Sequence, residues 1–400
     1  MIDNLNRMVN AFAALVFIQS KRRAIARIRN RDKMKSADYM KPFESNWFHI
    51  KHHGSEAAWI DAIALNKSAF LELWSTMDPY MPASKPLGRK CRMEREDMLA
   101  LTLYWLHTKV TIAKVGQFFG CPEDTTGRCM SKGLDVLDKH LASHPDAAIV
   151  WPNVSEIKQW AAAIKVKLLR CKQPFDLAEK PFAFVDGCDL RIQRSSQVEE
   201  HDLNYNKKNG FAKVGNIFVW SPTGKIIMAM MNAPGKMHDS DIAADLYKRL
   251  SDRTQTPSFF AILADQGFTA IDGSLICTLG PHTVCSIVVR SRSTQIARLR
   301  AASEWGNAGL KNAWARLDAK LSSDSAKRAR LIKICALLYN FRTALIGRNE
   351  IRTAFSPDWS GNWRLARSQP SGQQQFVAKM VGQLGAAAPE YGYEVDDNDA

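Results

Sequence analysis

Two rhythms of apolar and polar residues divide the chain. Over residues 41–150 apolar side chains recur every three or four positions, as in MEREDMLALTLYWLHTKV (93–110), which predicts amphipathic helices. From about residue 181 the pattern changes to short unbroken apolar runs that end in turn residues, which predicts buried strands. We therefore expect a helical region followed by a sheet-containing region.

The second region predicts a definite order of elements. A strand ends at Asp186, a hairpin surrounds the turn at 221–224, a helix opens at His238, and a fourth strand, FFAILAD, ends at Asp265. A further strand is expected at 284–290, before two long helices. This order is that of an RNase H-like α/β domain with a mixed sheet, which we expect over residues 181–355.

The helical region contains a pattern typical of a helix-turn-helix, within about residues 94–140 of a domain spanning 41–150. One helix is expected at 111–119, a break at Gly120-Cys121-Pro122, and a second helix from the acidic pair at 123–124. The second helix of such a motif usually enters the major groove of DNA. Its candidate DNA contacts are Thr125, Thr126, Arg128 and Lys132. An ordinary helical pair inside a bundle would give the same spacing.

Charge points to a polyanionic partner. Lys and Arg number 55 against 40 for Asp and Glu, a formal net charge of +15, which favours nucleic acid first and an anionic membrane second. A basic arm at residues 1–40 could be a nuclear import signal or could contact phosphates, although a solvated basic face would look alike. The apolar run AFAALVFI is too short to span a bilayer, so no membrane insertion is expected.

The remaining segments predict little chemistry. Residues 151–180 have the composition of a linker, and residues 356–400 are expected to be disordered. The eight cysteines show no metal-binding spacing, which predicts a reducing compartment and no structural zinc.

Three acidic residues carry the candidate chemistry. Asp186 and Asp265 each end an apolar strand, so both can lie at one edge of the sheet, and Glu304 lies in a later helix. Carboxylates gathered in this way repel one another unless a cation is present, and their hard oxygens suit Mg²⁺ or Mn²⁺. Each aspartate could instead be a turn residue, and Glu304 an ordinary exposed helix residue.

Other polar residues near these positions each allow two roles. His238 and Asp239 could cap a helix or approach the metal, and capping is the favoured interpretation. Asp189 is expected to face the other side of the strand from Asp186. Candidate phosphate contacts near the site are Lys207, Lys208, Arg298 and Arg300, each of which could equally belong to a solvated face.

Six motifs, in order, resemble those of the PIF/Harbinger-type DDE transposases, the superfamily that includes the harbinger transposase-derived nucleases. The resemblance covers residues 181–355 and rests on these segments: VDGCDLRI, NYNKKNGFAKVGNIFVWSPTGKI, APGKMHDSDI, LADQGF, RAASEWGNAGLK and ALLYNF.

The resemblance implies a metal-dependent DNA endonuclease and strand transferase that cuts transposon ends. Asp186, Asp265 and Glu304 would hold the metal ions, and Asp186 would bridge both. It also implies double-stranded DNA as partner, a separate Myb-like protein, a homo-oligomer when active, and a nuclear location. Where the family usually has Phe-Gly after the glutamate, this chain has Asn307-Ala308.

Two rival functions stay open, and the departure bears on the first of them. One is a domesticated, transposase-derived protein that binds DNA without cutting it. The other is a related metal-dependent nuclease that acts on RNA or on DNA repair substrates.

Overall fold

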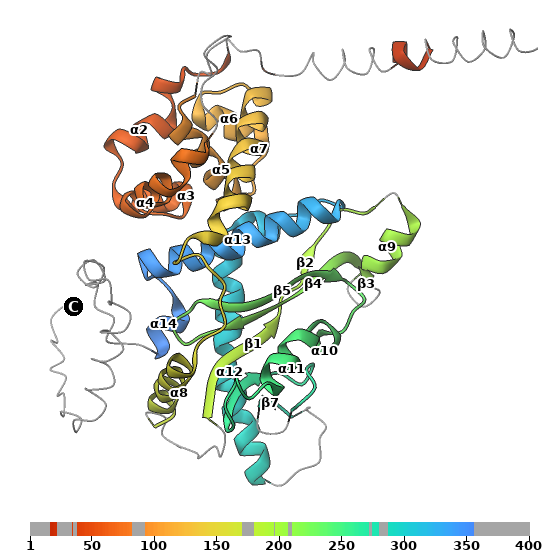
Figure 1. Ribbon diagram of the computed structural model, residues 1–400. Coiled ribbons are helices and arrows are strands. Elements are labelled where there is room, and N and C mark those ends of the chain that lie inside the picture. The colour runs from red at the N-terminus through yellow and green to blue at the C-terminus, as the bar shows by residue number, and fades with distance from the viewer. Residues whose placement is uncertain are drawn as a thin grey trace, which may run out of the picture.

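The computed structural model describes most of the chain between residues 38 and 355. The described residues are 17–21, 34, 38–81, 93–169, 180–195, 197–206, 210–271, 274–279 and 287–355. Most of the expected basic arm, Lys207, Lys208 and the tail at 356–400 lie outside them. The described part consists of a helical region above an α/β region, with the long helix α13 (Ser325–Ile346) between the two (Figure 1).

The helical region is built from short helices that begin at well-defined caps. The helices are α2 (Asn46–His53), α3 (Glu56–Ile63), α4 (Lys67–Met77), α5 (Arg95–His107), α6 (Ile112–Phe119) and α7 (Glu123–His140), with 3-10 turns at Pro42–Glu44, Asp78–Tyr80 and Leu141–Ser143. The side chains of Ser45, Ser55 and Asn66 accept a backbone hydrogen bond at the starts of α2, α3 and α4. Buried aromatic rings such as Trp47 and Trp59 fill the space between these helices.

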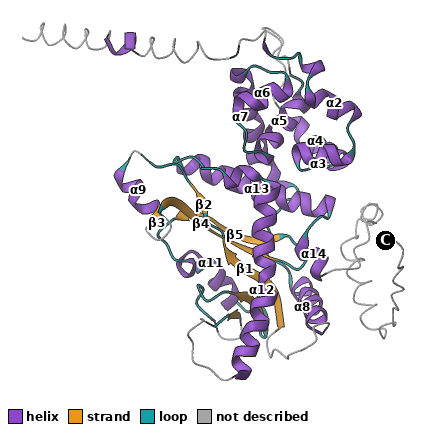
Figure 2. Cartoon of the chain, turned by 180° about the vertical axis from the view of Figure 1, so that it is seen from behind, coloured by secondary structure: helices purple, strands orange, loops and turns teal. Residues whose placement is uncertain are grey.

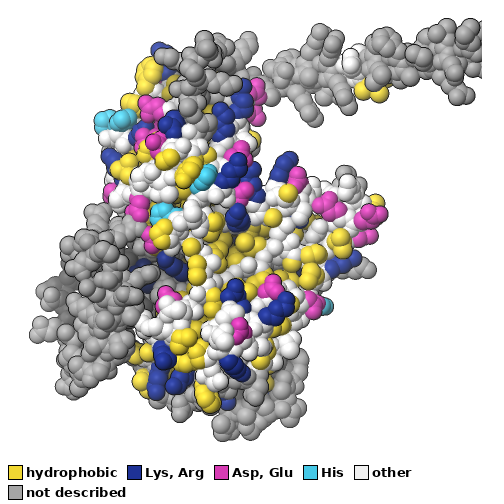
Figure 3. All heavy atoms as spheres, viewed as in Figure 1, with side chains coloured by type: hydrophobic (Ala, Val, Ile, Leu, Met, Phe, Trp, Pro, Cys, Tyr) yellow, Lys and Arg dark blue, Asp and Glu magenta, His cyan; other side chains and the backbone are white. Residues whose placement is uncertain are grey.

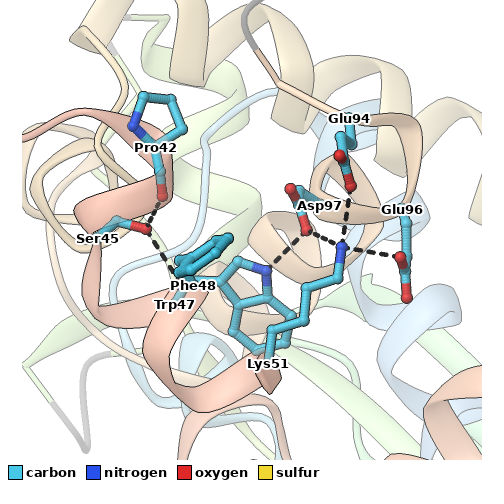
Figure 4. A network of polar contacts seen from close by, with 8 residues as sticks. All are labelled: Pro42, Ser45, Trp47, Phe48, Lys51, Glu94, Glu96 and Asp97. Carbon is cyan, nitrogen blue, oxygen red and sulfur yellow. Dashed lines mark hydrogen bonds and ion pairs between the residues drawn. The ribbon is translucent and has the colours of Figure 1, made fainter. Parts of the chain in front are cut away.

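A nearly buried lysine joins α2 to the start of α5 (Figure 4). The Lys51 ammonium lies 2.8 Å from Glu96, 2.9 Å from Asp97 and 3.1 Å from Glu94. The Trp47 indole donates to the same Asp97 carboxylate at 2.9 Å. Burial opposes the charged form of Lys51, but the three carboxylates outweigh it and raise the pKa of Lys51 above its usual value. The side chain therefore stays positively charged and joins the two helices by ion pairs.

The two helices predicted around Gly120 are present as α6 and α7. Thr111 caps α6, and Gly120 ends it with φ of 66°, a left-handed conformation that favours glycine. Helix α7 then begins after Pro122, with Glu123 and Asp124 in its first turn.

The α/β region contains one mixed sheet. Its strands are β1 (Lys180–Gly187), β2 (Leu190–Arg191), β3 (Tyr205–Asn206), β4 (Phe211–Trp220), β5 (Ile226–Pro234), β6 (Phe260–Ala264) and β7 (Leu275–Cys277). The five main strands lie in the order β5-β4-β1-β6-β7. The hairpin strands β4 and β5 are antiparallel to each other, β4 is antiparallel to β1, and β1, β6 and β7 are parallel. Strands β2 and β3 extend the sheet along the first half of β4.

Helices cover both faces of this sheet. The helices are α8 (Val154–Leu169), α9 (Val198–Asn204), α10 (Asp239–Ile242), α11 (Ala244–Ser251), α12 (Ile287–Ala313), α13 and α14 (Glu350–Phe355), with a 3-10 turn at Ala315–Asp318. Helices α10 and α11 lie in front of the sheet in Figure 1, and α12 crosses the opposite face over β1, where the reverse view of Figure 2 shows it in front. This arrangement confirms the predicted fold class: a helical region followed by a mixed α/β sheet of RNase H-like order.

Two local predictions were wrong. Residues 154–169, expected within a linker, form α8, whose Ile157 and Ala161 pack into the core beneath β1. Residues 287–290, expected in a strand, begin α12, and the fifth main strand is the shorter run Leu275–Cys277. In both cases an apolar run was too short for its period to distinguish helix, strand and linker.

The helical and α/β regions share a continuous hydrophobic core. It runs from Phe70 and Leu73 through α13 to Trp220 in the sheet. At the surface, Arg330 and Lys333 of α13 pair with Asp135 and Asp138 of α7, and Figure 3 shows basic and acidic side chains side by side there. Among the described helices, none is both long enough and apolar enough to cross a membrane.

Candidate active site

The parallel pairing of β1 with β6 brings two aspartates to one edge of the sheet. Phe184 pairs with Leu263, and both side chains face the core on the α12 side. Asp186 and Asp265 each lie two residues beyond this pair, so they share its face and stand opposite each other on neighbouring strands. The negative charge of Asp265 helps to raise the pKa of Asp186, which agrees with their proximity.

Asp186 is the most enclosed carboxylate of the site. Its side chain is 17% exposed, and Arg300 Nη1 lies 3.5 Å from Oδ1. The Asn307 side chain donates from Nδ2 to Oδ2 at 3.3 Å. Burial raises the pKa of Asp186 to about 6, with the Asp265 charge adding to the effect and Arg300 opposing it. A buried carboxyl with a raised pKa beside other acidic groups is typical of a functional site.

Asp265 is held by the turn that follows its strand. The Gly267 backbone N–H donates to Oδ1 at 2.7 Å, which fixes the carboxylate while leaving it half-buried. Asp265 directly follows the fully buried strand β6, so its backbone is held rigidly in place.

Asp239 is a third carboxylate at the same edge. A Cβ atom added to Gly187 would stand 2.7 Å from Asp239 Oδ2, so the carboxylate lies directly against the end of β1. Burial, Asp189 and Asp265 together raise the pKa of Asp239. His238 occupies the N-cap position of α10, in line with the favoured capping interpretation, although its side chain makes no cap bond, and Asp239 lies in the first turn of the helix.

Glu304 lies at the outer side of the site. Its side chain is 56% exposed, and Arg300 Nη2 lies 2.7 Å from its Oε1. Arg300 lies one turn before Glu304 on α12, and its guanidinium contacts both Glu304 and Asp186 of β1. Asp189 follows the end of β1 and pairs with Lys213 at 2.5 Å, and its charge reaches the acidic edge, because it helps to raise the pKa of Asp239.

A different group of side chains has the tightest metal-like spacing among the described residues. One potential ligand atom from each of Glu72, His144 and Asp146 lies within 4.8 Å of the others. However, His144 Nδ1 accepts a hydrogen bond from the Asp146 backbone at 3.2 Å, which puts the ring proton on Nε2 and removes the lone pair a metal would need. We interpret this group as a contact between α4 and the segment after α7.

The predicted DNA contacts separate into exposed and buried residues. Arg128 and Lys132 are exposed on α7, Thr125 is half-buried, and Arg298 is exposed on α12. Thr126 was wrongly predicted to be exposed: it is fully buried, and its hydroxyl donates to the carbonyls of Cys121 and Pro122. Arg300 faces Asp186 and Glu304, so its guanidinium is turned toward carboxylates.

Two contacts at this edge were missed by sequence reasoning. The Asn307 bond to Asp186 crosses 121 residues of sequence, and only the unusual residue type at this position could have drawn attention to it. The contact of Asp239 with β1 could have been suspected from Gly187, since a glycine directly after a strand aspartate leaves room for another group.

The mixed sheet and its acidic edge are consistent with an RNase H-like domain, and comparison with known proteins agrees. Residues 185–340 match the family model described as DDE superfamily endonuclease. The matched stretch begins at the end of β1, ends in α13, and contains Asp186, Asp265 and Glu304. It is a DDE superfamily endonuclease domain. The search of curated proteins gave no match, and neither did the search of solved structures.

Proposed function

We propose that this chain is a metal-dependent DNA endonuclease and strand transferase of the DDE transposase type, acting at transposon ends. One observation carries the proposal: the β1–β6 register sets Asp186 opposite Asp265 inside a stretch that matches the DDE superfamily endonuclease model. Glu304 and Asp239 add carboxylates at the same edge.

The donor set fits a hard divalent cation. Carboxylate oxygens are the ligands that Mg²⁺ and Mn²⁺ prefer, and enzymes of the DDE superfamily use divalent metals. Asp186, Asp265 and Glu304 would hold the ions, with Asp239 beside them. Bound there, such ions would supply Lewis-acid activation of a water or 3′-hydroxyl and charge stabilisation for the leaving oxygen of a phosphodiester.

The chain's own side chains supply position and charge balance. Gly267 fixes the Asp265 carboxylate, and Asn307 together with Arg300 holds that of Asp186. Arg300 neutralises part of the acidic cluster, so a cation that binds Asp186 and Glu304 competes with its guanidinium. The backbone of β1 and β6 keeps the two aspartates apart at a fixed spacing, which precise positioning of reacting groups requires.

The partners follow from the same proposal. Double-stranded DNA would be contacted by the exposed basic residues Arg128, Lys132 and Arg298. A Myb-like partner protein, an active homo-oligomer and a nuclear location complete the proposal, on the strength of the motif resemblance.

Cleavage by site variants tests this function. Purified chain should nick plasmid or duplex DNA in the presence of Mn²⁺, and Asp265→Ala should reduce the rate by at least about a hundredfold, because one ligand of the site is lost. Asp202→Ala, which removes an exposed aspartate of α9, is the matched control and should cut normally. Equal cleavage by wild type and Asp265→Ala would overturn the assignment.

The Arg300 ion pairs favour a second candidate, a domesticated DNA-binding protein without cleavage. An internal guanidinium between Asp186 and Glu304 can balance their charge without any metal. This rival predicts normal DNA binding, no detectable Mn²⁺ binding and no cleavage. Measuring all three on one preparation separates it from the nuclease.

A further inference from the structure

One stripe of α12 lies along the end of β1. Arg300, Glu304, Asn307 and Lys311 follow one another at intervals of four, three and four residues, which puts them on one face of the helix. Arg300 and Asn307 contact Asp186, and Lys311 donates to the Asp189 carbonyl at 3.2 Å. The stripe therefore follows the strand end that carries the first aspartate.

The orientation of the Asn307 amide is set by its neighbours. Nδ2 lies 3.3 Å from Asp186 Oδ2 and 3.1 Å from the Gly187 carbonyl oxygen. Both neighbours are acceptors, so the nitrogen must face them, because an oxygen turned toward them would be repelled.

The other end of this amide has no protein partner among the described residues. Asn307 is 9% exposed, and its Oδ1 is buried without a hydrogen bond. Buried amide oxygens are normally satisfied, so one left open beside a carboxylate cluster suits a cation or a water held by one. If Asn307 served only to hold α12 against β1, its hydrogen bond to the Gly187 carbonyl would be enough.

We propose that Asn307 is a positioning residue for the metal site, which fixes the Asp186 carboxylate through Nδ2 and directs Oδ1 toward the bound cation or its water. The inference rests on the proposed function and deepens it.

The test is Mn²⁺ affinity, measured by calorimetry on the full-length chain without DNA. Asn307→Leu keeps the approximate volume and removes both polar contacts, and it should raise the Mn²⁺ Kd by about 10–100-fold, as loss of a ligand-orienting group does. Asn307→His, which can donate from Nδ1–H at similar reach, should recover part of the affinity. Asn312→Leu changes an exposed asparagine of the same helix and should bind as wild type does.

Thermal unfolding of the metal-free proteins, followed alongside, identifies a purely structural role. That role predicts a lowered unfolding midpoint for Asn307→Leu with an unchanged Kd, and this result would overturn the inference. If wild type binds Mn²⁺, Asp186→Ala does not, and Asn307→Leu binds as wild type, the metal site stands and only the inference fails. If wild type does not bind Mn²⁺, the proposed function fails and the inference fails with it.

Discussion

The Asp186 carboxylate combines strong burial with several charged neighbours, and this combination gives it a pH-dependent effect on folding. Its pKa in the folded protein is about 6, above the ordinary value of 3.8. Between these values the folded state binds more protons than the unfolded state does. The free energy of unfolding therefore falls as pH rises through this window, and the ionised carboxylate is destabilising above it.

Asp186→Asn should consequently stabilise the metal-free fold. At about pH 7.5 with a chelator present, the amide should raise the free energy of unfolding by roughly 1–3 kcal/mol, since a 2-unit pKa shift corresponds to about 3 kcal/mol. The gain should shrink as pH falls from about 6 and disappear near pH 4, where the aspartate is itself protonated. Urea unfolding across this range measures the effect. A variant less stable than wild type at neutral pH would contradict the prediction.

At the scale of elements, one asparagine of α13 joins three segments. Asn340 is fully buried; its side chain accepts from the Ile226 N–H at 2.7 Å and donates to the carbonyls of Ile226 at 2.8 Å and Ala148 at 3.1 Å. It thus binds the start of β5 as a neighbouring strand would, and it anchors the segment that follows α7. Asn340, the asparagine of the ALLYNF motif, is therefore a structural residue.

Removing that side chain should destabilise the fold. Asn340→Ala leaves the Ile226 and Ala148 backbone groups buried without partners, and we expect a loss of about 3 kcal/mol in the free energy of unfolding. Denaturant titration gives the value, and Asn312→Ala on the exposed side of α12 serves for comparison. A loss for Asn340→Ala no larger than that of the comparison variant would show that the bonds do not matter.

Sequence reasoning located the elements better than it located the contacts between them. The strand ending in Asp186, the hairpin, the strand ending in Asp265 and the two helices on either side of Gly120 have strong local patterns, and the structure contains each of them. Thr126 was misplaced because helical spacing does not say which face of α7 is packed. The contacts of Arg300, Asn307 and Asp239 join elements distant in sequence, so no local pattern could reveal them.

At the scale of the whole molecule, the shared core predicts cooperative unfolding. Leu73 of α4 is fully buried in the same cluster as Trp220 of the sheet. Leu73→Ala should cost about 2–5 kcal/mol and shift the entire transition without splitting it. Circular dichroism and tryptophan fluorescence should give coincident curves for wild type and variant. Two separate transitions would show that the helical and α/β regions are energetically independent.

The stripe on α12 makes the site sensitive to deletions within this helix. Arg300 and Asn307 meet the same carboxylate from positions two helical turns apart. Loss of a single codon between them would turn one relative to the other by about 100° around the helix axis. Substitutions at 301, 302 or 303 leave the number of residues between Arg300 and Asn307 unchanged, so both side chains keep their relative orientation around the helix. An in-frame deletion of one of these residues would point either the guanidinium or the amide away from Asp186.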